Sequence, residues 1–216
     1  IDDDRIVLLP NWYKGREYSG CKSDKLLEKY NLKGKFIAIF GGTIGEAQAV
    51  WNIATLAKHN LEKKDVVFLI VGRGTKKGVL EDIAKKDNLT NIRFLNYLPR
   101  EDYEQILELA DLGLISIDEK YKVPTCPSKI IGYMALAKPV LAMFNEGSDY
   151  GEYYIDQTGC GLYSVDLNHK KMFENFDWFY SHPKERVLMG MAGYNYYKTH
   201  LTVEAVCNTL NNQIIK

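Results

Sequence analysis

The chain alternates between short, continuously apolar runs and longer stretches in which apolar side chains recur every three or four positions. The first kind indicates strands buried on both faces, and the second indicates helices with one face packed on a core. The expected strands cover residues 36–40, 66–71, 92–95, 112–117, 140–144 and 162–165. The expected helices cover residues 21–31, 46–59, 78–86, 100–110, 129–137, 168–180, 183–197 and 203–214. Because strands and helices alternate through most of the chain, we predict an α/β fold, a doubly wound parallel sheet with right-handed crossovers and a helical C-terminal tail.

The most informative stretch is CPSKIIGYMALAKPVLAMF, at residues 126–144. Pro127 interrupts regular structure, Ser128 is a good N-cap, and the residues from Lys129 onward suit a short helix, which Pro139 ends. The start of a helix presents unpaired backbone N–H groups and the positive end of its dipole, so a phosphate could be held there beside Lys129. A core helix bounded by prolines is the alternative interpretation.

A glycine-rich segment follows the first of the long strand runs. The sequence GGTIG stands between an apolar run and a helical pattern, where glycines let the backbone approach a ligand and leave free N–H groups at the helix start. The spacing matches neither GxGxxG nor a P-loop, and a structural tight turn explains it equally well. The candidate ligand-binding residues in this segment are Gly41, Gly42, Thr43 and Gly45.

The second long strand run ends in the turn Gly72-Arg73-Gly74. Open α/β sheets bind ligands at the carboxyl ends of their strands, which makes Arg73 a candidate anion contact. A solvent-exposed turn arginine is the alternative. We expect the nearby Lys76 and Lys77 to be solvated, as flexible loop lysines usually are.

Composition narrows the functional classes. Lysine plus arginine equals aspartate plus glutamate, at 28 each, so no general attraction to nucleic acid or to an anionic membrane is indicated. The cysteines lie far apart without a CxxC pair or a neighbouring histidine, and we therefore expect a reduced, cytosolic chain without a metal. They are Cys21, Cys126, Cys160 and Cys207. No signal peptide or membrane-spanning run is visible.

The length of 216 residues fits a single large domain. The chain starts at Ile1 without a methionine, in an acidic segment followed by IVLLPNWY, which looks like a cut through a longer polypeptide. We expect residues 1–20 to be an entry or linker segment, with an edge strand or linker at 6–9, and residues 183–216 to form the terminal helices.

Several separate stretches, taken in order, resemble one known family. They are LLPNW at 8–12, FGGTIGEAQAV at 40–50, FLIVGRG at 68–74, NIRFLNYLPREDY at 91–103, ADLGLISI at 110–117, PSKIIGYMALAKPVLA at 127–142 and HPKERVLMGMAGYNYY at 182–197. Together they resemble the C-terminal, nucleotide-sugar-binding domain of GT-B-fold glycosyltransferases, specifically the GT4 family of bacterial surface-polysaccharide enzymes. The IGEAQ element looks most like the amino-sugar transferases of O-antigen and capsule assembly, such as the WbuB-like enzymes.

The resemblance implies a Rossmann-like half of a GT-B fold that binds a UDP- or GDP-sugar. A sugar would pass, with retention and without a metal, to a growing polysaccharide or lipid-linked acceptor. The acceptor would be held by an N-terminal domain that this chain lacks, and the whole protein would lie in the cytoplasm, where it could associate peripherally with the inner face of the membrane. The segment from Gly41 to Gly45 and the helix start at Ser128 and Lys129 would face the diphosphate, Arg73 would add charge, and Tyr97 and Leu98 would lie near the base. Catalytic residues are not identified.

The chain departs from the family pattern at the expected phosphate and ribose contacts. Where many members carry an arginine after the first strand and a lysine near the next helix start, this chain has Gly42 or Thr43 and Gln48. The family's paired glutamates fall on Pro124 and Gly132, and the second of them normally contacts the donor ribose. Losing that carboxylate removes hydrogen-bond acceptors worth about 1–3 kcal/mol. The carboxylates that could replace it are Asp118, Glu119 and Glu146.

Two further functional classes stay open at the level of sequence. The domain could keep the GT-B architecture with a degraded donor site and act as a scaffold or partner-binding module, as Gly132 suggests. It could also resemble the GT-B-like sugar-nucleotide 2-epimerases, which need catalytic histidines and carboxylates. The four histidines fall in stretches better interpreted as helix surfaces or loops, which disfavours the epimerase; they are His59, His169, His182 and His200.

Overall fold

The computed structural model describes residues 9–121, 128–145, 151–165 and 168–214. In this part of the chain six strands form one sheet, in the order β3-β2-β1-β4-β5-β6, and every neighbouring pair is parallel. The strands are β1 (Phe36–Thr43), β2 (Val66–Arg73), β3 (Ile92–Leu95), β4 (Leu112–Ser116), β5 (Val140–Phe144) and β6 (Gly161–Val165). The predicted doubly wound parallel α/β sheet is confirmed.

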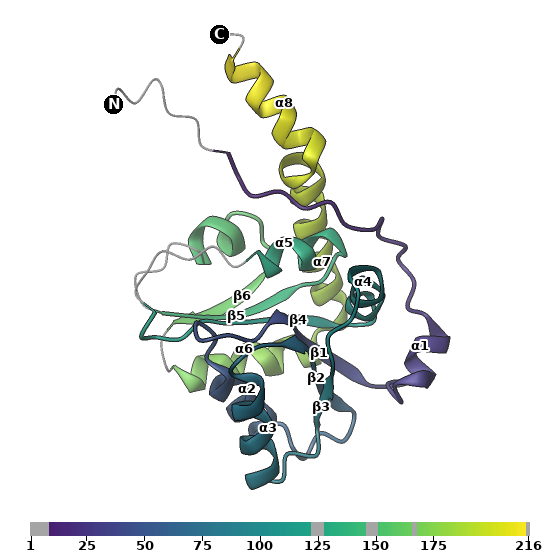
Figure 1. Ribbon diagram of the computed structural model, residues 1–216, viewed down its shortest axis with the longest axis vertical. Helices are drawn as coiled ribbons and strands as arrows, with labels where there is room; N and C mark the ends of the chain where they lie inside the picture. Colours follow the sequence, from purple (N-terminus) through teal and green to yellow (C-terminus); the bar gives the residue numbers. More distant parts are fainter. Residues whose placement is uncertain (1–8, 122–127, 146–150, 166–167, 215–216) are drawn as a thin grey trace.

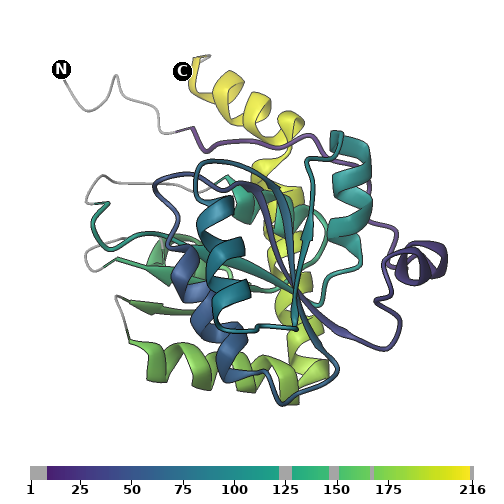
Figure 2. The same cartoon turned by 60° about the horizontal axis from the view of Figure 1, so that its bottom comes forward.

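Helices cover both faces of the sheet (Figure 1). They are α1 (Asp24–Lys29), α2 (Val50–His59), α3 (Lys77–Lys86), α4 (Arg100–Glu108), α5 (Lys129–Ala135), α6 (His169–Ser181), α7 (Pro183–Tyr196) and α8 (Val203–Ile214), with the π-helical segments η2 (Gly151–Asp156) and η3 (Tyr197–Leu201). The helices α2, α3 and α6 lie on one face and α4 and α5 on the other, while α8 points away from the sheet (Figures 1 and 2). The predicted C-terminal helices are therefore present.

The strand side chains divide between two cores, one on each face of the sheet. Along β1, Ile37 and Ile39 pack toward α4 and α5, and Ala38 and Phe40 pack toward α2, α3 and α6. Successive side chains of a strand point to opposite faces, so a strand covered by helices on both sides must be apolar at every position. This explains why the strand runs in the sequence are continuous and do not alternate.

The glycine segment after the first run belongs largely to β1, which corrects the predicted strand end at residue 40. The register with β2 continues through Gly41↔Val71, Gly42↔Gly72 and Thr43↔Arg73. The following helix, predicted from residue 46, starts at Val50 because 46–49 form a turn. The amide side chain of Gln48 holds that turn by accepting the N–H of Gly45 at 2.7 Å.

The helix within residues 126–144 is shorter than predicted. It ends at Ala135, because Leu136 leaves helical geometry and Ala137 adopts a left-handed φ of 52° before Pro139. Ser128 stands at its N-cap position, but its backbone is already helical and its hydroxyl makes no capping bond, so the predicted cap is wrong. By contrast, the hydroxyl of Ser23 caps α1 by accepting the N–H of Leu26.

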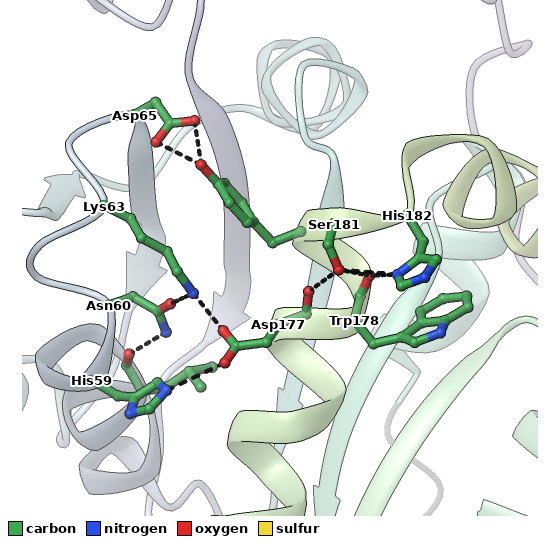
Figure 3. Close-up of polar contacts among 10 residues, drawn as sticks. His59, Asn60, Lys63, Asp65, Asp177, Trp178, Ser181 and His182 are labelled. Atoms are coloured by element: carbon green, nitrogen blue, oxygen red, sulfur yellow. Dashed lines mark hydrogen bonds and ion pairs between the residues drawn. The ribbon is translucent and has the colours of Figure 1, made fainter.

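A polar cluster fastens α6 beneath the sheet (Figure 3). The Lys63 ammonium in the loop after α2 binds Asp177 of α6 and donates to Asn60 Oδ1 at 2.7 Å. His59 Nε2 lies 3.6 Å from the Asp177 carboxylate, and the Tyr180 hydroxyl of α6 donates to the Asp65 carboxylate beside β2 at 3.0 Å. These contacts fix α6 against the opposite end of the sheet from the carboxyl ends of the strands.

Among the described residues no helix is long and apolar enough to cross a membrane. The predicted edge strand or linker at 6–9 lies, apart from Leu9, outside the described residues. Pro124, Cys126, Pro127 and Glu146 lie outside them as well.

Candidate functional site

A cleft of about 370 Å³ opens where β1 and β2 reach their carboxyl ends. Open parallel sheets bind ligands at the carboxyl ends of their strands, where the loops to the following helices begin. The residues that line the cleft are Tyr13, Gly42, Thr43, Val71, Gly72, Arg73, Tyr97, Leu98, Arg100 and Tyr103. Five of the predicted ligand-binding residues are among them: Gly42, Thr43, Arg73, Tyr97 and Leu98.

Glycine is required where the backbones of β1 and β2 meet the cleft. Gly42 and Gly72 pair in register and have φ of +90° and +139°. A Cβ on Gly72 would collide with the Gly42 carbonyl oxygen, and a Cβ on Gly41 would collide with the Tyr103 side chain. The cleft floor is therefore bare backbone, at which a ligand can approach closely.

The predicted phosphate segment divides between the cleft and its surroundings. Gly42 and Thr43 line the cleft, whereas Gly41 is backed by Tyr103. Gly45 is absent from the lining residues, and its N–H already donates to Gln48. A phosphate would thus meet Gly42 and Thr43 and not the whole segment.

Lys129 extends from the first residue of α5 to the end of β1. Its Nζ donates to the Thr43 carbonyl oxygen at 2.9 Å and lies 5.0 Å from the centre of the Phe40 ring. Its Cε would be 3.7 Å from a Cβ placed on Gly42. Burial lowers the pKa of Lys129 to about 8, so the ammonium is held in a site that favours a counter-anion. The fold therefore brings Lys129 to Gly42 and Thr43, as predicted.

The other predicted residues of α5 differ in position. Ser128 is exposed at the helix start, whereas Gly132 is buried one turn further along. A Cβ on Gly132 would lie 3.8 Å from Cζ of Tyr13, which lines the cleft. Gly132 therefore touches the cleft wall from behind and does not itself line it.

Two arginine–tyrosine pairs stand in the lining of the cleft. The Arg73 guanidinium carbon lies 4.6 Å from the Tyr97 ring centre, and that of Arg100 lies 4.8 Å from the Tyr13 ring centre. Tyr97 is 59% exposed, so its ring is available for stacking at the mouth. Sequence reasoning selected Arg73 and Tyr97 but missed Arg100 and Tyr13, since they lie far apart in the chain and match no local motif.

A buried carboxylate on α4 joins this second pair. Glu104 is 3% exposed and accepts from the Tyr13 hydroxyl at 2.6 Å, the Arg100 Nε at 2.9 Å and the Arg16 backbone N–H at 2.9 Å. Burial by itself raises the pKa of Glu104, but these donors outweigh it and hold the pKa below its usual value. Burial and the adjacent carboxylate raise the pKa of Tyr13. Glu104 is thus ionised and Tyr13 protonated at neutral pH.

The carboxylates suggested as substitutes for the missing glutamate do not line the cleft in the described part of the chain. The Asp118 carboxylate accepts the N–H of Lys120, in its own loop, at 2.9 Å. Neither Asp118 nor Glu119 is among the lining residues, and Glu146 lies outside the described residues. The buried carboxylate beside the cleft is Glu104, for which the sequence carried no signal.

A second cavity, of about 260 Å³, lies at the amino-terminal edge of the sheet. Its charged side chains have protein partners. Asp111 binds Lys22 at 2.7 Å and Arg186 at 3.7 Å, and the Lys138 ammonium donates to the Glu108 carbonyl oxygen at 2.7 Å. Because these pairs join the entry segment, α4 and α7, the cavity is best explained as part of the structural packing.

The histidines make contacts typical of packing. His59 stacks on Phe173 with ring centres 3.9 Å apart, and His182 stacks on Trp178 at 4.8 Å. His182 also lies 3.0 Å from the Ser181 hydroxyl, but the nearby Asp177 carboxylate binds Lys63 and His59 (Figure 3), so these side chains do not form a nucleophilic triad. The described residues contain no group of three or more His, Cys, Asp or Glu side chains that could hold a metal ion.

A family model described as glycosyl transferases group 1 matches residues 22–196. Among curated proteins, the chain is 29% identical over 164 residues to the probable glycosyltransferase WbjE of Pseudomonas aeruginosa. The match covers 74% of this chain and 40% of WbjE. The chain therefore spans well under half of that relative.

Solved structures share the fold. A variant of S. aureus TarM, in complex with fondaparinux, alpha-GlcNAc-glycerol and UDP, matches with a TM-score of 0.75 at 16% identity, over 100% of this chain and 41% of TarM. The C-terminal domain of the glycosyl transferase group 1 protein LpcC from Francisella tularensis matches with a TM-score of 0.68 at 18% identity, over 87% of this chain and 96% of that domain. At these identities the similarity establishes the fold alone.

Proposed function

The chain belongs to the group 1 glycosyl transferases, and from that membership we propose that it is the donor-binding half of a glycosyltransferase. The donor is a UDP- or GDP-sugar, and the sugar passes with retention to a growing surface polysaccharide or a lipid-linked acceptor. An N-terminal domain outside these 216 residues holds the acceptor. The whole enzyme works in the cytoplasm, peripherally at the inner face of the membrane. The similarity to WbjE and the UDP in the TarM complex support this proposal.

The observation that carries the proposal is the placement of cationic groups around a bare backbone floor. Lys129 reaches the Thr43 carbonyl oxygen from α5, and Arg73, which pairs with Thr43 in the register of β1 and β2, lines the cleft. Gly42 and Gly72 leave room for a ligand to contact the strand ends. A diphosphate placed there would receive two positive charges as well as close backbone contacts.

The same groups suit the chemistry of sugar transfer. Negative charge grows on the leaving nucleoside diphosphate as the bond to the sugar breaks, and pre-oriented donors stabilise that charge most effectively. Lys129 and Arg73 would provide the stabilisation, and Tyr97 would stack against the base at the mouth of the cleft. We propose that no metal is required, so nucleotide affinity should not change when EDTA is added.

The test is calorimetric titration of the chain with UDP, GDP, UDP-sugars and GDP-sugars, with uridine and guanosine as phosphate-free references. We expect one nucleotide series to bind, the diphosphates more tightly than the nucleosides, and Lys129→Met to reduce only the diphosphate advantage. Lys33→Met is the matched control, because Lys33 pairs with Glu28 on the surface, away from the cleft. If no member of the panel gives heat or raises the melting temperature, donor binding is refuted.

The finer assignment concerns the sugar. We propose, from the IGEAQ element, that the enzyme belongs with the WbuB-like amino-sugar transferases. Competition against bound UDP would then rank UDP-N-acetylamino sugars above UDP-glucose and UDP-galactose. Equal affinities for all of these UDP-sugars would contradict the subgroup assignment but not the proposed donor site.

A second candidate is a GT-B-like module whose donor site has degraded and which serves as a scaffold or partner-binding half. The observation in its favour is that Gly132 offers the cleft no side chain and is covered by Tyr13. Gly132→Glu separates the two, because restoring the carboxylate should raise nucleotide affinity in a degraded site. If the wild-type chain binds the nucleotide and Gly132→Glu does not increase the affinity, the donor site is not degraded.

A further inference from the structure

The segment that precedes α1 supplies a wall of the donor cleft. Tyr13 lies in this entry segment, outside the sheet and its helices, and nevertheless lines the cleft. Its backbone N–H donates to the Leu201 carbonyl oxygen at 3.0 Å, and its own carbonyl oxygen accepts the Tyr197 hydroxyl at 3.0 Å. Its ring stands beside Gly132, with Cζ 3.8 Å from the position that a Cβ on Gly132 would take. Tyr13 is therefore seated on α5 and η3 as a fixed part of the site.

Two carboxylates one helical turn apart on α4 hold the segment in place. Glu104 accepts the Tyr13 hydroxyl and the Arg16 N–H, and Glu108 accepts both the N–H and the hydroxyl of Ser19, at 2.9 and 2.6 Å. Both carboxylates are almost fully buried, so each missing donor would leave a buried charge less well compensated. This cost fixes the segment, and with it Tyr13, to the domain.

Arg100 is held in the same arrangement but stays accessible. Its Nε donates to Glu104, one Nη2 proton goes to the Lys14 carbonyl oxygen, and its guanidinium lies over the Tyr13 ring. A guanidinium has five N–H donors, and its contacts with Glu104 and Lys14 leave further donors unused. The side chain is 58% exposed and lines the cleft, so the remaining donors can meet a ligand.

The order of residues along the cleft indicates which group of the ligand would lie beside Arg100. Lys129 and Gly132 are three residues apart and share a face of α5, so the Tyr13 ring at Gly132 lies next to the anion position at Lys129. In a nucleoside diphosphate the ribose follows the phosphates. Because Glu104 neutralises Arg100, the pair suits a neutral hydroxyl group better than a second phosphate.

We propose that Arg100 recognises the ribose hydroxyls of the donor nucleotide, with Glu104 and Tyr13 as its positioning residues. This inference rests on the proposed donor binding and adds a specificity that the proposal does not contain. A site built to bond a hydroxyl discriminates against a ligand that lacks it, because the ligand then forms one hydrogen bond fewer with the site. The chain should therefore prefer ribonucleotides to 2′-deoxynucleotides.

The experiment compares the affinities of UDP and 2′-deoxy-UDP, or of GDP and 2′-deoxy-GDP if guanine is the base. For the wild type we expect a preference of about five- to a hundredfold for the ribonucleotide. Arg100→Met should bring the ratio close to one, Arg100→Lys should retain part of it, and Glu104→Gln and Tyr13→Phe should lower it. Lys33→Met, which removes a surface charge that pairs with Glu28 away from the cleft, should leave the ratio unchanged.

The ratio of the ribonucleotide and 2′-deoxynucleotide affinities distinguishes loss of ribose recognition from loss of folding, because an unfolded domain binds neither nucleotide. Circular dichroism melting of each variant shows the folded fraction, and Glu104→Gln keeps the shape of the side chain if Arg100→Met unfolds. A wild-type chain that binds both sugars equally, or an Arg100→Met variant that keeps the preference, overturns this inference and leaves donor binding standing. A wild-type chain that binds no nucleotide overturns both.

Discussion

Titration of Lys129 should make nucleotide affinity fall as pH rises above neutrality. Burial lowers the pKa of its ammonium to about 8 in the free protein. A group with that pKa is about nine-tenths protonated at pH 7 and about one-tenth at pH 9. If the diphosphate binds the ammonium and not the neutral amine, its affinity should fall about tenfold over this range. A charge-assisted hydrogen bond of about 1.5–3 kcal/mol is large enough to allow that fall.

The sign follows from proton linkage. A bound anion favours the charged amine and raises its pKa, so the complex holds more protons than the free protein and binding takes up a proton. Above about pH 7.5 the nucleotide phosphates are already ionised, since their last pKa is on the order of 6, and Lys129 dominates the change. Near pH 8.5 the uptake should be about 0.8 proton.

The assay is calorimetric titration between pH 7.5 and 8.5 in pairs of buffers with different ionisation enthalpies, which gives affinity and proton uptake together. Lys129→Met should bind more weakly at pH 7.5 and show no pH dependence. Lys138→Met is the matched control, because burial also lowers the pKa of Lys138 to about 8, but at the opposite edge of the sheet. A flat affinity in the wild type, or the same decline in Lys129→Met, would refute the assignment of Lys129 as an anion contact.

Three further outcomes follow from the geometry. Gly72→Ala should destabilise the fold by about 2 kcal/mol or more in urea unfolding, because the φ of Gly72 is +139° and a Cβ there would meet the Gly42 carbonyl oxygen. The control Gly78→Ala, in open space on α3, should be neutral or stabilising by about 0.5–1 kcal/mol. Equal effects of the two substitutions would contradict the register of β1 and β2. Asp177→Asn should cost about 1 kcal/mol or less, since its pair with Lys63 is half exposed, and a loss above about 3 kcal/mol would show that the cluster in Figure 3 is a central support. EDTA should leave UDP affinity unchanged, and a drop that Mg²⁺ restores would show that a metal takes part.

The predictable part of the site consists of residues next to strand ends. Gly42, Thr43 and Arg73 directly end buried apolar runs, and in a parallel sheet such positions must share one edge. Lys129 could be selected because a helix start between prolines is visible in the sequence. These choices required only the periods of strands and helices and the direction of the crossovers.

Other features could not be predicted from the sequence, because they depend on contacts between distant segments. Whether the glycine segment was strand or turn depended on its pairing with β2, which supplies hydrogen bonds that a local pattern does not reveal. Ser128 is a residue type that often caps helices, but its backbone is already helical where the chain enters α5. Local propensity is a weak prior that such tertiary context overrides.

The sequence by itself determined the α/β class, the order of strands and helices, and the edge of the sheet at which a ligand is expected. Hydrophobic periodicity is a local property, and right-handed crossovers leave few topologies to choose from. Only the tertiary structure decided that Tyr13, Arg100 and Glu104 form one wall of the cleft. Tyr13 and Glu104 are 91 residues apart, and the buried carboxylate that joins them is stabilised by donors that meet only after the chain has folded.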